Sequence, residues 1–315
     1  MLAPIDKARN NGNNIIQVVI TRGCDLFTCS QCTQLLPFRK DTREMTLDCI
    51  EEALHCLRGW PGVIACFGGN PVTHSRFPEV CALWERLVPE KQRGLWTNNL
   101  MRHGEIIKKT FWPSGTFNLN VHGSETAAKE MEKWLPGIPV WGREGASHHG
   151  RVMGRYGDFG ISHEEWAQKR ELCTINQNWS GAIYERDGEP YMYFCEVAGS
   201  HDGVRGENHG VRCEPGCWEW GMDRFQHQVT ACCDRSCVVP LNLKGANDLE
   251  ETYHVSPSLV PLTLDSLSSR VKVVESIDDK DKVHELTDYE GLRADQQTKQ
   301  ERLADARSPT RRRRK

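Results

Sequence analysis

The stretch TRGCDLFTCSQC, Thr21–Cys32, places three cysteines, Cys24, Cys29 and Cys32, within nine residues. It directly follows an apolar run, Ile15–Ile20, that predicts a buried strand. Three thiolates on one loop can hold three irons of a cubane cluster and leave the fourth iron without a protein ligand. An open metal position is what a chelating substrate needs. The sequence therefore predicts an open-site [4Fe-4S] cluster on this loop.

Outward from the cysteine loop, short apolar runs alternate with helical patterns. The predicted strands are Ile15–Ile20, Val63–Phe67, Gly94–Thr97, Phe117–Val121 and Ile138–Trp141. The predicted helices are Met45–Leu57, Phe77–Leu87, Gly104–Lys109 and Glu125–Trp134. A weaker pattern allows a sixth strand near Arg151–Ile161. This βα repeat predicts an α/β fold with a parallel sheet or open barrel, whose active site lies at the carboxyl ends of the strands.

The second predicted strand ends in FGGNP, Phe67–Pro71, where two glycines let a ligand approach the backbone and proline stops the strand. The cysteine triplet after strand one and this motif after strand two together resemble the radical S-adenosylmethionine (SAM) superfamily. The resemblance covers about the first half of the chain. It implies a partial (βα)6-type radical SAM barrel, in which SAM chelates the free iron and yields a 5′-deoxyadenosyl radical that abstracts hydrogen from a substrate.

The resemblance also assigns residues to the cofactors. The cluster ligands would be Cys24, Cys29 and Cys32. The residues along SAM would be Gly68, Gly69, Asn70, Thr97, Asn98, Asn120 and His122.

Three features depart from the family's pattern. Four residues separate Cys24 from Cys29 where three are usual, and Gln31 replaces the usual aromatic residue before the third cysteine. Asn70 stands where glutamate is common. An asparagine oxygen accepts a hydrogen bond from an ammonium group but brings no charge, so weaker SAM binding is expected.

A second, cysteine-rich region follows Gly142, with a helix predicted over His163–Arg170 and a hairpin over Ala182–Arg186 and Tyr191–Cys195. It is similar to the auxiliary-cluster extension called SPASM or, in its shorter form, twitch. The ligands implied are Cys173, Cys195, Cys213, Cys217, Cys233 and Cys237, with adjacent Cys232 and Cys233 not expected on one metal. Four thiolates suit an iron-sulfur cluster or zinc. The resemblance favours an auxiliary iron-sulfur cluster.

The 315 residues are thus predicted to form a radical SAM core over 1–160, a cysteine-rich auxiliary cluster domain over 161–245 and a charged, disordered tail over 246–315. The basic end, Arg311–Lys315, is interpreted as solvated. A net charge of −3 gives no reason to expect a nucleic-acid or membrane partner. No apolar leader or spanning run is found, and cysteines interpreted as ligands or core thiols fit a reducing compartment, so a cytoplasmic protein is expected. Outside the two cysteine-rich regions, Cys49, Cys56, Cys66 and Cys81 are expected to be buried core thiols.

The predicted function is hydrogen abstraction with SAM, on a peptide or protein substrate if the auxiliary extension is indicative. Such an enzyme needs an electron donor such as flavodoxin or ferredoxin. Two alternatives use the same residues: a non-catalytic, zinc-stabilised binding module, and an iron-sulfur electron carrier that does not cleave SAM.

Overall fold

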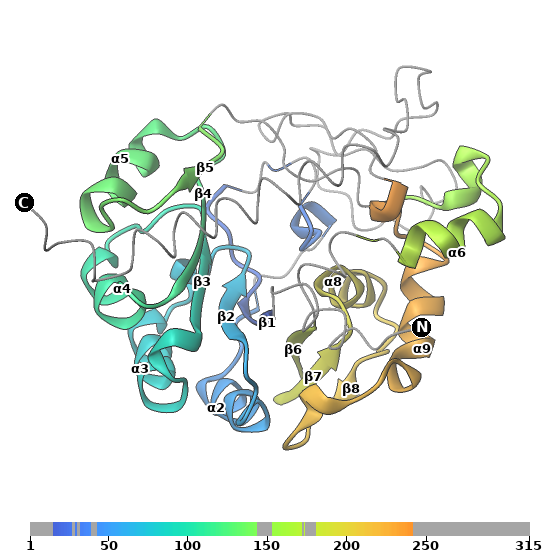
Figure 1. The fold of residues 1–315 in the computed structure, drawn as a ribbon, viewed down its shortest axis with the longest axis horizontal. Coiled ribbons are helices and arrows are strands. Elements are labelled where there is room, and N and C mark those ends of the chain that lie inside the picture. Colours follow the sequence, from blue (N-terminus) through green and yellow to red (C-terminus); the bar gives the residue numbers. More distant parts are fainter. Residues whose placement is uncertain are drawn as a thin grey trace, which may run out of the picture.

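The computed structural model describes residues 15–26, 29, 32–38, 43–143, 153–171, 173 and 181–241. They form one eight-stranded sheet in the order β5-β4-β3-β2-β1-β6-β7-β8 (Figure 1). The strands are β1 Ile15–Thr21, β2 Val63–Gly68, β3 Arg93–Thr97, β4 Thr116–Asn120, β5 Val140–Trp141, β6 Ala182–Arg186, β7 Glu189–Tyr193 and β8 Val211–Arg212. From β5 to β6 all neighbours pair in parallel, whereas β7 and β8 add antiparallel pairings. The fold is therefore mixed α/β with a mainly parallel sheet, as predicted at that level.

Helices follow each of the first four strands. The helices of the described residues are α2 Leu47–Cys56, α3 Phe77–Leu87, α4 Gly104–Phe111, α5 Glu125–Trp134, α6 His163–Glu171, α8 Glu196–Arg205 and α9 Gln226–Gln228. Successive helices from α2 to α5 pack against one another. Two of these helices are capped by a side chain at their start: at α2 the Thr46 side chain accepts from the Cys49 backbone N–H at 3.3 Å, and at α5 the Ser124 side chain accepts from the Ala127 N–H at 3.2 Å.

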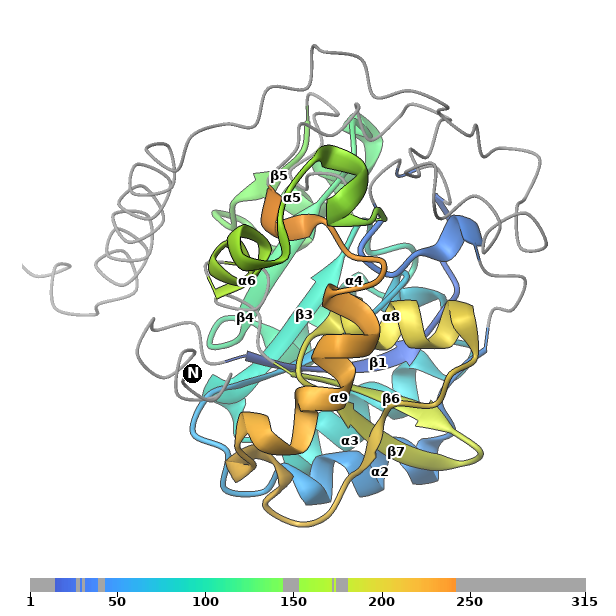
Figure 2. The same cartoon turned by 90° about the vertical axis from the view of Figure 1, so that its right-hand side faces the viewer.

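The centre of the sheet is buried on both faces. Every residue of β1, sequence IIQVVIT, is buried, which is typical of a parallel strand covered on both sides. Figure 2 shows α2 on one side of β1, β6 and β7, and α8 on the other. The thiols expected in the core are buried, which confirms that placement; these are Cys49, Cys56, Cys66 and Cys81.

The expected sixth strand near Arg151–Ile161 is wrong. Residues 151–152 lie outside the described part, and within 153–161 Met153 makes only an isolated bridge to Cys237 while Tyr156–Phe159 forms a 3-10 helix. Glycines at 154, 157 and 160 weaken any strand there. The sixth parallel strand is instead β6, which pairs with β1 rather than extending the sheet beyond β5.

The hairpin was predicted, but its second strand is β7, two residues earlier than Tyr191–Cys195. Cys195 instead caps the start of α8, a helix that the sequence analysis did not predict. Two glycines inside α8 lower its helix propensity. One of them is required, because a Cβ on Gly199 would lie 2.2 Å from the Tyr184 ring.

The sheet runs on from the first half of the chain into the hairpin, across residue 160. The division there into two domains stays a prediction. The predicted tail over 246–315, with Arg311–Lys315, lies outside the described residues. None of the helices in the described ranges has the length and apolar character that a membrane crossing requires.

Candidate active site and metal centres

The cysteine loop is attached to the end of β2 by backbone contacts. Gly69 N–H donates to the Thr21 carbonyl at 3.0 Å, and Asn70 N–H donates to the Gly23 carbonyl at 2.7 Å. A Cβ on Gly69 would lie 2.3 Å from the Gly23 oxygen, and one on Gly68 would lie 2.4 Å from the Thr21 oxygen. Glycine is thus required in both positions by the approach of the cysteine loop itself, whereas the sequence analysis attributed it to a ligand.

Asn70 is the centre of a buried polar network beside this loop. Its side-chain N–H group donates to Asp25 Oδ1 at 2.7 Å and to Asn98 Oδ1 at 2.6 Å. Its oxygen accepts from Thr97 Oγ1 at 2.5 Å. Asn98 in turn donates to Cys24 Sγ at 3.5 Å. The ends of β2 and β3 are therefore joined to the first cysteine through side chains as well as backbone.

The end of β4 contacts a second cysteine. His122 Nδ1 lies 3.6 Å from Cys29 Sγ, and its backbone N–H donates to Asn120 Oδ1 at 3.0 Å. His122 has a φ of 44°, in the left-handed region, which turns the chain sharply after the strand. The structure thus brings the residues predicted along SAM, from the ends of β2, β3 and β4, to the cysteine loop after β1.

Among the thiols of this loop, Cys32 has an environment that disfavours a free thiolate. Cys24 is buried, and Cys29 and Cys32 are half-buried. Burial raises the pKa of Cys32 to about 12, and the charges of Cys24 and Glu196 add to the rise. Ligation to a metal would have to displace the protons. Three sulfur donors on one loop, with polar side chains at the adjoining strand ends, fit a cluster with one open iron.

A second thiol group lies around the start of α8. Burial raises the pKa of Cys195 well above its usual range, and the neighbouring charges of Cys173, Cys233 and Cys237 raise it further. Four of the six cysteines expected as auxiliary ligands thus lie near enough for the charges of three to act on Cys195.

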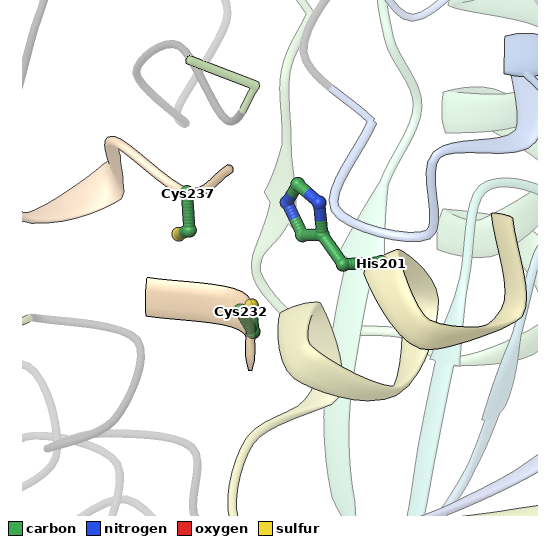
Figure 3. Close-up of side chains that lie close together, drawn as sticks. All are labelled: His201, Cys232 and Cys237. Atoms are coloured by element: carbon green, nitrogen blue, oxygen red, sulfur yellow. The ribbon is translucent and has the colours of Figure 1, made fainter. Parts of the chain in front are cut away.

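His201 of α8 points toward two cysteines of this region (Figure 3). One ligand atom each from His201, Cys232 and Cys237 lie within 4.8 Å of one another, and all three residues are buried. His201 Nδ1 is 3.0 Å from Ser236 Oγ, while Nε2 has no hydrogen-bond partner. Ligands of a tetrahedral zinc ion, at 2.0–2.3 Å from the metal, are about 3.3–3.8 Å apart. The trio could therefore hold a metal ion.

The charges of the trio also suit a metal. A hydrogen bond from Cys232 and the nearby His201 ring lower the pKa of Cys237, while the same hydrogen bonding raises the pKa of Cys232. A single thiolate is thereby favoured, and thiolate is the form that binds metal. Sequence reasoning missed His201 and set Cys232 aside, because no spacing links a helix in the middle of the region to the π-helical turn Val229–Cys233.

The remaining pair, Cys213 and Cys217, groups with a different residue. The Cys213 thiol donates a hydrogen bond to Cys217, which raises the pKa of Cys213, and Cys56 at the end of α2 adds its charge. Gly216 N–H donates to the Cys56 carbonyl at 3.0 Å. The six cysteines expected as auxiliary ligands therefore fall into two groups, one at α8 and one at α2.

The fold and the site define an α/β protein whose cysteine loop lies at the carboxyl ends of parallel strands, with a second thiol group at α8. No family model matches the chain, and no curated protein matches its sequence. Among solved structures, the chain is similar to the crystal structure of BtrN in complex with AdoMet and 2-DOIA, with 14% identity and a TM-score of 0.38, over 70% of this chain and 87% of that chain. At that identity and TM-score the likeness carries no conclusion about function.

The close approach of Gly69 to the Gly23 carbonyl predicts that a side chain at position 69 destabilises the protein. Gly69→Ala should lower the free energy of unfolding by about 1–3 kcal/mol, because the added methyl group overlaps a backbone oxygen that cannot move without the cysteine loop. Urea unfolding and iron bound per chain after anaerobic reconstitution measure the two effects. Gly157→Ala is the matched control, since nothing lies within 4 Å of its Cβ position. Equal stability and equal iron in the two variants would contradict the proposed constraint.

Proposed function

We propose that the chain is a radical SAM enzyme, with Cys24, Cys29 and Cys32 holding a [4Fe-4S] cluster that binds SAM. The observation that carries the proposal is the connected network from Cys24 through Asn98 and Asn70 to Asp25. A structural thiol loop needs no such set of polar groups beside it. When bound, the cluster and SAM would supply a 5′-deoxyadenosyl radical for hydrogen abstraction.

Asp25 supplies the negative charge that Asn70 lacks. In the resembled family a glutamate at the Asn70 position would face the ammonium group of SAM. Here the Asp25 carboxylate accepts a hydrogen bond from the Asn70 side chain at 2.7 Å and another from Asn99. The negative charge is thus carried by the cysteine loop rather than by β2. A carboxylate held by two amides remains an acceptor for an ammonium group.

The other residues would orient and enclose the cofactors. Thr97 and Asn98, at the end of β3, hold Asn70 in place. Asn120 fixes the turn that carries His122, and the His122 ring contacts Cys29. Strand β1, which leads into the cysteine loop, is buried along its whole length and keeps water from that side of the loop.

A second metal centre is proposed at α8, with Cys173, Cys195, Cys233 and Cys237 as its cysteine ligands. An auxiliary iron-sulfur cluster remains the proposal for it, and the position of His201 and Cys232 beside Cys237 adds a nitrogen and a sulfur donor to the same region. The substrate class, a peptide or protein, and an electron donor of the flavodoxin or ferredoxin type are carried over from the resemblance.

Reductive SAM cleavage tests the main proposal. The anaerobically reconstituted protein, reduced with dithionite and given SAM, should form 5′-deoxyadenosine, and Cys29→Ala should reduce the yield at least tenfold. Cys81→Ala, which removes a buried core thiol in α3, is the matched control and should retain the product. A zinc module would bind no iron, and an electron carrier would bind iron without forming product. Product formation that is equal in wild type and Cys29→Ala would exclude the proposed cluster.

The charge on Asp25 predicts a specific loss of SAM affinity. Asp25→Asn should weaken SAM binding about tenfold, the loss of one charge-assisted hydrogen bond, without removing iron. Equilibrium dialysis with SAM on the iron-loaded protein gives Kd, and absorbance gives the cluster. Asp48→Asn in the first turn of α2 is the control. An unchanged Kd in Asp25→Asn would show that the charge is not used.

Metal content tests the second centre. In a chain carrying Cys24→Ala, Cys29→Ala and Cys32→Ala together with Cys213→Ala and Cys217→Ala, the remaining metal reports the α8 region. Adding Cys237→Ala should remove that metal, and adding His201→Ala should lower its occupancy, whereas His227→Ala on the exposed surface should have no effect. Iron and zinc are counted by plasma mass spectrometry. Full metal retention in the Cys237→Ala chain would refute the centre.

A further inference from the structure

A cavity of about 640 Å³ lies where α2 meets the chain around the end of β8. Two thiols are part of its wall, Cys56 at the end of α2 and Cys213 just after β8. Ligand pockets in proteins have volumes of this order, roughly 300–1,000 Å³. Among the described residues that line the cavity, none belongs to the cysteine loop or to the thiol group at α8. The cavity is therefore a separate place where thiols face a space large enough for a small molecule.

A second thiol is in contact with the thiol of Cys213. The Cys213 S–H group donates a hydrogen bond to Cys217, which is fully buried. Backbone hydrogen bonds hold the turn between the two cysteines. Cys217 N–H donates to the Glu214 carbonyl at 2.9 Å, and Gly216 N–H donates to the Cys56 carbonyl at 3.0 Å. A thiol that lines a cavity, with a second thiol held against it, is the arrangement that thiol–disulfide exchange requires.

The pair offers too few donors for a metal of its own. A structural zinc ion takes four protein ligands. Among the residues that the structure describes, three candidate ligand atoms come within 4.8 Å of one another only at the site of His201, so Cys56 does not complete a trio with Cys213 and Cys217. In a cubane each thiolate binds its own iron, which two sulfurs in hydrogen-bond contact do not suit. A covalent bond between the two sulfurs uses both of them without a metal.

The cavity has an excess of negative charge. Four carboxylates line it, those of Asp48, Glu51, Glu52 and Glu214. Two of them are paired with arginines: Glu51 lies 2.8 Å from Arg86, and Glu52 lies 2.6 Å from Arg212. A concave surface with more carboxylates than cations concentrates cations and repels anions. A small molecule that reaches Cys213 is therefore favoured if it carries a positive charge.

We propose that Cys213 and Cys217 form a dithiol that reduces small disulfides carrying amino groups, which bind in the acidic cavity. The Cys213 sulfur attacks the bound disulfide, forms a mixed disulfide with one half of it and releases the other half as a thiol, which takes up the Cys213 proton. The Cys217 sulfur then attacks the Cys213 sulfur and releases the second half, which takes up the Cys217 proton. Two protein thiols and one small disulfide thus become one protein disulfide and two small thiols. Neither SAM nor a cluster takes part, so this inference is independent of the proposed function.

Three small disulfides of different charge test the proposal on the full-length reconstituted protein in the absence of oxygen. They are cystamine, hydroxyethyl disulfide and oxidised glutathione, which are cationic, neutral and anionic. After the reaction, free thiols are blocked with N-ethylmaleimide, the chain is digested with trypsin and the peptides are measured by mass spectrometry. Peptide 213–224 contains Cys213 and Cys217 and no other cysteine, whereas peptide 44–58 contains Cys49 and Cys56. Cystamine should convert peptide 213–224 to its internal disulfide about tenfold faster than oxidised glutathione does, and peptide 44–58 should form no internal disulfide.

Variants separate the roles of the second thiol and of the charge. Cys217→Ser should stop the reaction at the mixed disulfide, so that cysteamine stays bound to Cys213. Glu214→Gln should lose part of the preference for cystamine, while Glu219→Gln, which lies outside the cavity wall, should keep it. Equal rates with the three disulfides, or a disulfide that joins peptide 213–224 to peptide 44–58, would overturn the proposal. So would exchange that occurs only after iron and zinc are removed with a chelator, because it would show that the pair binds a metal.

Discussion

The contact between Gly69 and the Gly23 carbonyl is the constraint on which the rest of the site depends. A backbone can approach another backbone this closely only where no Cβ intervenes, and both partners here are glycine. The hydrogen bonds donated by the Gly69 and Asn70 backbone N–H groups then fix the position of the cysteine loop relative to the end of β2. Everything placed on that loop, including Cys24 and Asp25, takes its position from this contact.

The same contact explains why the carboxylate beside Asn70 comes from Asp25 of the cysteine loop and not from β2. Because the cysteine loop is fixed to the end of β2, the Asp25 carboxylate on that loop lies within hydrogen-bonding distance of the side chain of residue 70. Asn70 is not a weakened acid in this arrangement, since its amide donates to two neighbours and holds Asp25 in place. The GGNP motif alone does not reveal the hydrogen bond between Asn70 and Asp25, because Asp25 lies 45 positions earlier in the chain.

Local periodicity accounts for what the sequence could predict. The strands β1 to β5 and the helices α2 to α5 follow from apolar patterns within each segment. The partner of β1 on its open side could not be predicted this way, because parallel pairing with β6 joins segments far apart and no local pattern encodes it. Helix α8 was not predicted because its two glycines lower the helix propensity of the segment. His201, which α8 carries, was therefore not predicted as a ligand either.

The number and spacing of the cysteines in the second region did not predict how they group in the structure. Spacing grouped Cys213 and Cys217 with the other thiols of the second region, yet they lie with Cys56 at α2 because β8 ends there. Spacing also set Cys232 aside in favour of Cys233, although Cys232 lies beside His201 and Cys237 while the charge of Cys233 acts on Cys195. Side-chain direction within one turn thus decides which donors can share a metal, and this is a property of three-dimensional structure that composition does not carry.

The two thiol groups are related by α8. Its first turn carries Glu196, whose charge acts on both groups, and its second turn carries His201, which faces Cys237. A helix that begins immediately after Cys195 therefore lies between the cysteine loop of β1 and the thiols of the second region. Since β6 and β7 contact α8, pairing of β6 with β1 is what places the second region beside β1. Strand β7, which pairs antiparallel with β6, thus contributes to the position of α8 and of the thiols around it.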